Sequence, residues 1–337
     1  MIKTLRMLLM AAFYCAYTQA ATIEQVAAGV KLIEPFGVAF DRAGALYICE
    51  YKGEKITRLD RTGTATLFAG TGVAAYGGDG GPANQAALRD PHGLVIGRDE
   101  VMYIADTLNH RIRKVDLKTG AISTLAGTGT AGFSGDGGDA AKAAFNGVFA
   151  IALSPAGDKL YVADLSNRRI RMIALKTGII TSIAGNGTNG VPSDGAAAAE
   201  SPLEDPRAVA ADSQGNVYIL ERRGNALRVV DKKGKIRTAI KPGSITPNMN
   251  GPKHLCVDKK GNVIIADAEN HLVRRYSPRD GSTVTLAGTG QKGDHIEPGD
   301  PLKTQLNRPH GVFVHPSGDL YITDSYNHRV LKMQNWQ

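Results

Sequence analysis

The sequence predicts an all-β protein, a six-bladed β-propeller of four-stranded antiparallel blades closed by the N-terminal strand. One pattern of turns and short apolar strands recurs six times, at intervals of about 46 to 60 residues. The 40 glycines, against 8 phenylalanines and 1 tryptophan, indicate many turns and small side chains packed in sheets. The sixth copy lacks a last strand, which residues near the N-terminus can supply.

Each copy begins with a short apolar strand and a tight turn. The six strand openings are Pro35-Phe36-Gly37, Pro91-His92-Gly93, Asn146-Gly147, Pro206-Arg207-Ala208, Pro252-Lys253-His254 and Pro309-His310-Gly311. The turns that follow are Asp41–Gly44, Gly97–Glu100, Ser154–Gly157, Asp212–Gly215, Asp258–Gly261 and His315–Gly318. Asp and Ser favour such turns by hydrogen bonding to nearby backbone, and glycine tolerates the positive φ of a reversal. The pattern predicts β-hairpins.

The second strand of each copy is apolar and ends in an acid. Its central residue is tyrosine in five copies and isoleucine in the fifth: Tyr47, Tyr103, Tyr161, Tyr218, Ile264 and Tyr321. The acids are Glu50, Asp106, Asp164, Glu221, Asp267 and Asp324. A polar turn, a third strand such as 109–115, a second turn such as 118–120 and a fourth strand such as 122–127 follow. Four short strands in each of six units is the layout of a propeller.

The two ends of the chain predict how the ring closes. The sixth copy ends at Trp336-Gln337 after its third strand, while Ile23–Ala27 repeats the pattern of the fourth strand at Ile122–Ala126. The N-terminal segment therefore supplies the missing outer strand of the last blade, which pairs two strand edges and ties the termini together. We expect a single propeller domain over residues 21–337.

Residues 1–20 have the features of a secretory signal peptide. Lys3 and Arg6 form a basic start, Met7–Tyr17 an apolar stretch, and Thr18-Gln19-Ala20 a small-residue cleavage site. The apolar stretch is too short for a bilayer, which needs about 20 residues, so we expect no membrane span. The mature protein is expected to begin near Ala21 and to be secreted or periplasmic.

Export leaves two cysteines and a modest positive charge. Cys49 and Cys256 fall in non-adjacent blades, too far apart for a disulfide, and are expected to be buried thiols. Loss of Lys3 and Arg6 lowers the formal charge from +8 to +6. The remaining excess is spread along the chain, which gives weak attraction to acidic surfaces and nothing specific.

The segment Asp106–Ile112, with copies at Asp164–Ile170 and Asp324–Val330, carries an Asp-x-x-Asn-His-Arg-Ile signature that resembles the NHL repeat. The resemblance covers essentially residues 22–336 and implies a six-bladed propeller. It leaves the function open, because propellers of this family include protein-binding, RNA-binding and enzymatic members. RNA binding is disfavoured by export and by arginines on third strands, which we expect to face solvent at the blade exterior.

The direction of the strands sorts the loops onto two faces of the disc. First strands begin and second strands end on one face, which we call the top face, and the short hairpin turns lie on the bottom face. Long connections at 73–90, 130–145, 188–205 and 291–308 are expected on the top face, where loops on a rigid scaffold usually bind. Two of them contain glycine-rich runs, at 77–81 and 135–138, which we interpret as turns followed by one helical turn, because neither has the residues of a phosphate loop.

The six strand-ending acids allow two interpretations. Six carboxylates near one channel could bind a cation. A residue present in every blade is more simply explained by a need that every blade has, here capping the polar turn or pairing with a following arginine such as Arg111 or Arg329. We expect the structural role.

Ligand-binding residues should be those that break the symmetry at the channel. His92 and His310 follow the opening proline in blades two and six, Arg207 does so in blade four, and His254 lies one position further along in blade five. The peptidylglycine amidating lyases are similar propellers that bind zinc through histidines of alternate blades, which by position would be His92, residue 207 and His310. Arginine at 207 cannot be a ligand, so we expect no metal there unless His254 or a loop residue takes its place. Backbone hydrogen bonding is the alternative role for the two histidines.

A second comparison is with six-bladed calcium-dependent lactonases, which need a carboxylate where a first strand opens. The residues here are Phe36, His92, Gly147, Arg207, Lys253 and His310, none of them acidic. No serine, histidine and aspartate order or cysteine and histidine pair indicates a nucleophile.

We therefore expect a binding or scaffold module rather than an enzyme. Its top-face loops would recognise a protein, peptide or glycan through His92, Arg207, His254 and His310, without a cofactor, and the protein would be a monomer. Nucleic acid is not an expected partner. The alternative is an enzyme at the channel mouth, either a metal-dependent lyase or a lactone hydrolase.

Overall fold

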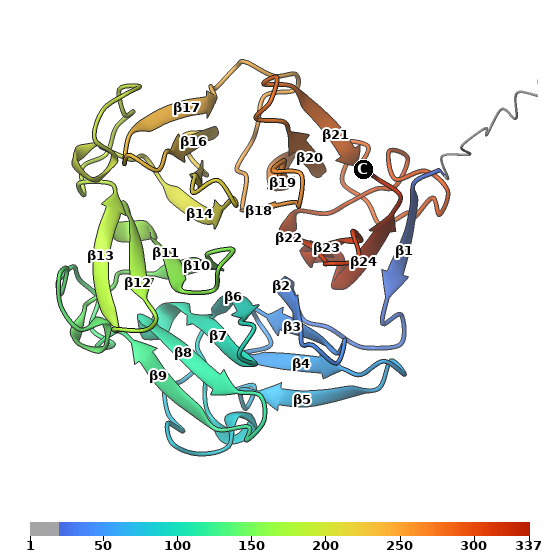
Figure 1. Ribbon diagram of the computed structural model, residues 1–337. Helices are drawn as coiled ribbons and strands as arrows, with labels where there is room; N and C mark the ends of the chain where they lie inside the picture. The colour runs from blue at the N-terminus through green and yellow to red at the C-terminus, as the bar shows by residue number, and fades with distance from the viewer. Residues whose placement is uncertain (1–19) are drawn as a thin grey trace, which may run out of the picture.

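The computed structural model describes residues 20–337, which form six four-stranded antiparallel sheets around a central axis (Figure 1). The first three blades are β2 (Pro35–Phe40), β3 (Leu46–Glu50), β4 (Lys55–Leu59) and β5 (Ala65–Ala69); β6 (Pro91–Ile96), β7 (Val101–Asp106), β8 (Arg111–Asp116) and β9 (Ile122–Ala126); and β10 (Val148–Leu153), β11 (Lys159–Asp164), β12 (Arg169–Ala174) and β13 (Ile179–Ala184).

The last three blades follow the same order. They are β14 (Pro206–Ala211), β15 (Val217–Glu221), β16 (Ala226–Val230) and β17 (Ile236–Ile240); β18 (His254–Val257), β19 (Val263–Asp267), β20 (Leu272–Tyr276) and β21 (Thr283–Ala287); and β22 (Pro309–Val314), β23 (Leu320–Asp324), β24 (Arg329–Gln334) and β1 (Thr22–Val26). The helices of the described residues are single 3₁₀ turns, η1 (Ala83–Gln85), η2 (Thr107–Asn109), η3 (Ala140–Lys142), η4 (Leu165–Asn167), η5 (Ala198–Glu200), η6 (Ala268–Asn270) and η7 (Ser325–Asn327). None of these is long and apolar enough to cross a membrane.

The ring closes through the N-terminal strand, as the sequence predicts. β1 pairs antiparallel with β24 in continuous register from Thr22 opposite Gln334 to Val26 opposite Val330. Figure 1 shows β1 as the outer strand of the last blade. Ile23 is 1% exposed and packs in a core that combines blades five and six. The six innermost strands contact one another in chain order, and β22 meets β2.

The cores lie between neighbouring blades. The second strands are almost wholly buried, with Tyr47, Tyr103, Tyr161, Tyr218 and Tyr321 at most 9% exposed. Alternating side chains of these strands face two different neighbours, so each hydrophobic cluster draws residues from adjacent blades. Because each blade is a thin sheet with an apolar surface on both sides, only the closed ring buries all of this area.

The long connections between blades lie elsewhere than the sequence analysis expects. Segment 73–90 leaves the top face and runs down the outer edge of β9. Near the bottom face, the backbone of Gly80 and Gly81 hydrogen bonds with that of Ile122. The Ala83 N–H donates to the Gly120 carbonyl. Segments 130–145 and 188–205 pair in the same way with β13 and β17, and Pro298 of the fourth segment accepts from Ile23 of β1. These segments cover strand edges that would otherwise expose unpaired backbone groups, so most of their length builds the rim rather than the top face.

The glycine-rich runs and alanine stretches form the turns of these covering segments. Gly78 and Gly135 have φ of +87° and +91°, and a Cβ on either would lie within 2.7 Å of Ala86 or Ala143 backbone. The alanine stretches contain η1 and η3, as expected. Cys49 and Cys256 are free thiols, Cys49 buried and Cys256 partly buried. The signal-peptide prediction falls, except for Ala20, outside the described residues.

Ring closure makes a prediction about β1. Replacing Ile23 by alanine should lower the free energy of unfolding by about 2 to 5 kcal/mol, because it opens a cavity at the closing seam. The control is Gln25→Ala, an exposed position of the same strand, which should stay within about 0.5 kcal/mol. Chemical denaturation of both variants measures the difference. Equal effects would show that β1 is a peripheral addition to the disc.

Candidate functional site

The acid at the end of each second strand is a structural anchor. All six carboxylates are 0% exposed. Each accepts a hydrogen bond from a backbone N–H that lies 17 or 18 positions earlier, just before the first strand of the same blade, with N···O distances of 2.6 to 2.9 Å. The acids therefore fix the approach of the chain to each first strand, which is a structural role. The expected capping of the polar turn is wrong, because the turns that begin at Asp106, Asp164, Asp267 and Asp324 are not capped by these side chains.

An arginine of the third strand pairs with the acid in five blades. Arg113, Arg171, Arg228 and Arg274 are at most 2% exposed and pair with the acids of their own blades, as does Arg329. The expected pair with Arg329 is confirmed, whereas Arg111 is wrong: its guanidinium donates to the carbonyls of Asn109 and Thr128 and lies over the Tyr76 ring. The sequence predicts that the third-strand arginines face solvent. This is wrong for the four that are at most 2% exposed, because each of them neutralises a buried carboxylate.

A second set of side chains clasps neighbouring blades together. A residue in the left-handed conformation precedes each third strand, and in five of the six blades its side chain accepts a backbone N–H at the start of the next blade. The contacts are His110 with Gly147, His271 with Arg308, His328 with Glu34, Asn225 with Gly251 and Glu54 with Asp90. Arg168 occupies the position in blade three and cannot accept. The histidine of the Asn-His-Arg signature is thus an acceptor between blades, a role that the sequence analysis does not identify.

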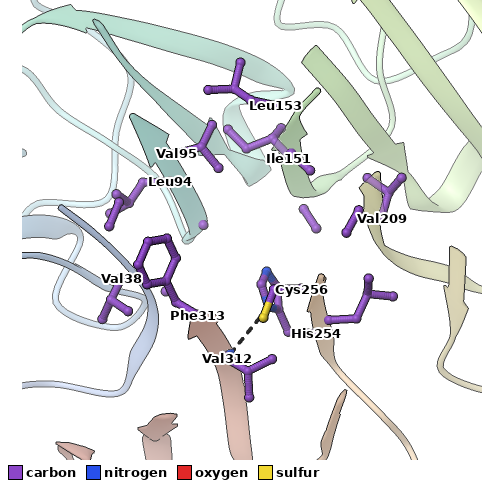
Figure 2. A pocket seen from close by; sticks show the side chains of 18 of the residues that line it. Val38, Leu94, Val95, Ile151, Leu153, Val209, His254, Cys256, Val312 and Phe313 are labelled. Carbon is purple, nitrogen blue, oxygen red and sulfur yellow. Dashed lines mark hydrogen bonds between the residues drawn. The ribbon is translucent and has the colours of Figure 1, made fainter. Parts of the chain in front are cut away.

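The innermost strands surround a central cavity of about 270 Å³. Figure 2 shows Val38, Leu94, Ile151, Val209 and Val312 around it, so its wall is largely apolar. The imidazoles of His92 and His254 also line it. His254 is held there because its Nδ1 accepts the Val312 N–H of the next blade at 3.4 Å, the dashed line of Figure 2.

A packed group that we call the mouth cluster lies where the innermost strands begin, at the top face. Its members are the residues after the opening prolines together with two aromatic neighbours: Phe36, Tyr51, His92, Phe149, Arg207, Lys253 and His310. Phe36 stacks between Tyr51 and His310, with ring centroids 4.4 and 4.0 Å away. Blade three has a glycine, Gly147, where its first strand opens. The Phe149 ring fills the space that a side chain there would occupy, since a Cβ on Gly147 would lie 2.8 Å from this ring.

His92 and His310 are oriented alike by their own backbones. Nδ1 of His92 donates to the carbonyl of Asp90 at 2.8 Å, and Nδ1 of His310 donates to the carbonyl of Arg308 at 2.9 Å, since a carbonyl can only accept. The expected backbone hydrogen bonding is therefore present at both. The proton on Nδ1 leaves Nε2 of each neutral ring as an acceptor.

Arg207 is the electrostatic centre of the cluster. It is 6% exposed, and its guanidinium lies over the Phe149 ring at 4.3 Å from the centroid. Burial, and then the charge of Arg222, lower the pKa of Arg207 to about 9, so it remains a cation at neutral pH. Burial, and then the charge of Arg207, lower the pKa of His254 to about 4 and hold the pKa of His92 and of His310 well below the usual range. The histidines are thus neutral beside a fixed positive charge.

The sequence predicts four ligand-binding residues, and the structure brings all of them to one end of the channel: His92, Arg207, His254 and His310. Their role in binding stays a prediction. Two of them are buried, since Arg207 is 6% and His310 is 7% exposed. The reason is that the six first strands converge on the axis, so the rings and the guanidinium stack across a narrow opening. Sequence reasoning missed Tyr51 and Phe149, because neither follows an opening proline.

The residues of the mouth do not fit the zinc set of the amidating lyases. A guanidinium stands where the third imidazole would be, and it repels a cation. Within residues 20–337, no three His, Cys, Asp or Glu side chains are grouped so that they could hold a metal ion.

Comparisons with known proteins agree with this architecture. The NHL repeat model matches residues 249–276 and 306–333, and the teneurin NHL domain model matches residues 5–116. The chain is 25% identical over 267 residues to SUPPRESSOR OF QUENCHING 1 of Arabidopsis thaliana, covering 73% of this chain and 25% of that protein. It is 25% identical over 291 residues to human NHL repeat-containing protein 2, covering 74% and 39%. The chain thus spans well under half the length of these curated relatives.

Solved structures share the fold at low identity. A protein of unknown function from Bacteroides thetaiotaomicron superposes with a TM-score of 0.67 at 15% identity, covering 94% of this chain and 76% of that one. A streptogramin B lyase superposes with a TM-score of 0.58 at 16% identity, covering 94% and 98%. The repeated acids, the clasps and the closed ring define a six-bladed propeller. The chain belongs to the NHL-repeat β-propellers.

The buried acids predict a stability effect. Asp106→Asn should lower the free energy of unfolding by at least about 2 kcal/mol, since Asp106 receives N–H groups from Arg89, Asn109 and Arg113. Asp99→Asn, at an exposed position in the preceding turn, should change it by no more than about 0.5 kcal/mol. Thermal and urea unfolding measure both. A thermally silent Asp106→Asn would reopen the cation-binding interpretation.

The clasp of blade one predicts a pH effect. Burial raises the pKa of Glu54 to about 7. Because the folded pKa exceeds the unfolded one, this group's contribution to stability is full at acidic pH and is lost as pH rises through about 7. Glu54→Gln keeps an acceptor for the Asp90 N–H and removes the titration.

The variant should therefore lose less stability than wild type between pH 5 and pH 8. Urea unfolding at the two pH values tests this, and parallel pH profiles for the two proteins would contradict it.

Proposed function

We propose that this NHL-repeat propeller is an exported binding or scaffold module that captures a protein, peptide or glycan partner on its top face. The observation that carries the proposal is the contrast between two sets of residues. The acids and clasps recur around the ring and hold the fold, whereas the mouth cluster varies between blades, with only His92 and His310 alike. Unrepeated aromatic and cationic side chains at one end of a symmetric disc are what a specific binding surface requires.

The partner would contact the exposed rim of the cluster. Tyr326 is 38% exposed beside His310, and Leu108 is 38% exposed on the equivalent turn of blade two. Polar residues surround them, since Arg308 pairs with Glu269 at 2.6 Å and Lys52 with Asp90 at 3.1 Å. An aromatic and apolar centre with a charged rim is the usual composition of a protein or peptide interface.

An enzyme at the same mouth is the second candidate. The observation in its favour is the pair of Nε2 acceptors on His92 and His310, which could take a proton from a substrate. Fold neighbours include a streptogramin B lyase and a putative gluconolactonase with a TM-score of 0.62, but at 16% and 13% identity they support the fold alone. Burial, and then the adjacent Arg207 charge, lower the pKa of both rings, which favours the binding function.

Peptide and glycan arrays probed with the purified protein test the binding proposal. Tyr326→Asp on the top face should weaken the best array ligand at least about tenfold, whereas Ile179→Asp, equally apolar and exposed near the bottom face, should leave its affinity unchanged. Equal losses in both variants, or no ligand on either array, would argue against a top-face binding module.

Export is proposed on the basis of the N-terminal sequence. Expression of the full chain in a Gram-negative bacterium should give periplasmic or secreted protein whose first residue is Ala21, because the Thr18-Gln19-Ala20 site is cleaved. Mass spectrometry of the N-terminal peptide measures this. Intact Met1 in the cytoplasmic fraction would be the contrary result.

A further inference from the structure

The guanidinium of Arg207 is buried, and no carboxylate in the described part of the chain forms an ion pair with it. Neither Nε nor Nη1 has a hydrogen-bond partner among residues 20–337, although both atoms are inaccessible. The third-strand arginines of the neighbouring blades, by contrast, are bound to carboxylates. Burying an unpaired charge is strongly unfavourable, so such a group usually has a partner.

The acids near Arg207 are engaged elsewhere. Asp205 accepts from Arg222 at 2.7 Å. Glu269 is bound by Arg308 at 2.6 Å and approached by Lys253 at 3.5 Å. The local field is therefore positive, and no side chain of the described region is placed to neutralise Arg207.

We propose that Arg207 anchors a binding site for a carboxylate group, carried either by a small organic acid or by the C-terminus of a peptide. This deepens the proposed function by naming the chemistry that the top face recognises. A carboxylate supplies one negative charge and two acceptor oxygens that match the edge of a planar guanidinium. Phe149 covers a face of the guanidinium, and the N–H groups of Nε and Nη1 have no acceptor among residues 20–337.

The charge of the site selects a carboxylate over a dianionic phosphate. Arg207 is the unpaired cation of the mouth cluster in the described residues, and the imidazoles beside it are neutral. Nε2 of His92 and of His310 is an acceptor, so these rings cannot donate to a second negative charge. The rings of Phe36, Tyr51 and Phe149 offer apolar contacts to the carbon atoms next to the carboxylate.

Calorimetric titration of the mature protein, in a buffer free of carboxylates, tests the site. The small-acid probes are acetate and benzoate, with acetamide and benzamide as neutral isosteres. The peptide probes are N-acetyl-Gly-Gly-Phe with a free C-terminus and the same peptide as its amide. Inorganic phosphate is included at the same ionic strength.

We expect at least one acid probe to bind, its amide to bind at least about tenfold more weakly, and phosphate not to bind better. Arg207→Met should abolish the preference for the acid. Arg223→Met, which removes an 80% exposed cation nearby, should preserve it. Binding of acetate or benzoate would identify the ligand as a small organic acid, and binding of the free-acid peptide would identify it as a peptide C-terminus.

Two results would overturn the inference: no acid probe binds better than its amide, or Arg207→Met keeps the preference. The comparison of acid and amide uses wild-type protein, so it stands even if the variant does not fold. A failure of the carboxylate site can be told apart from a failure of the proposed binding function. An array ligand that binds the top face equally to wild type and Arg207→Met would keep the binding module and exclude the carboxylate site.

Discussion

The buried carboxylate at the end of each second strand is the interaction on which the rest of this propeller depends. It binds the backbone before the first strand in every blade, the asparagine of the polar turn in four blades, and an arginine of the third strand in five. Ionised acids inside a protein are stable only when fully paired, so this contact specifies one arrangement of the chain. The clasp from the left-handed residue before the third strand then fixes the next blade. Repetition of the two contacts turns a row of weak sheets into a closed disc.

This division leaves the residues after the opening prolines free to differ. Their backbones are held by acids and clasps, so their side chains can be chosen for the mouth. In this chain they include a phenylalanine, two histidines and two cations, which stack across the channel instead of lining an open pore. Arg207 is the member whose burial has no internal compensation. A buried charge that destabilises the free protein is more simply explained by binding than by folding.

Much of the fold could be predicted from the sequence, because repetition multiplies weak local signals. The strands, hairpin turns and closing strand follow from alternating apolar residues and turn chemistry at fixed spacing. The burial of Arg113 and Arg171 could not, since a charged residue in an alternating strand is normally read as solvent-facing. Nor could the path of segment 73–90, because its hydrogen bonds to β9 join residues some 40 positions apart. The gathering of His92, Arg207, His254 and His310 follows from blade order, whereas the unpaired state of Arg207 depends on what Asp205 binds.

The most direct measurement of this account compares two buried arginines of blade four. Arg228 is 1% exposed and pairs with Glu221 at 2.7 Å, while Arg207 is 6% exposed and unpaired. Methionine preserves much of the side-chain volume at either position. If repeated charges hold the fold and the unrepeated one serves a ligand, Arg228→Met should lower the free energy of unfolding by about 3 to 5 kcal/mol. Arg207→Met should leave it unchanged within about 1 kcal/mol or raise it. Comparable losses of stability in the two variants would contradict the account and make Arg207 a part of the scaffold.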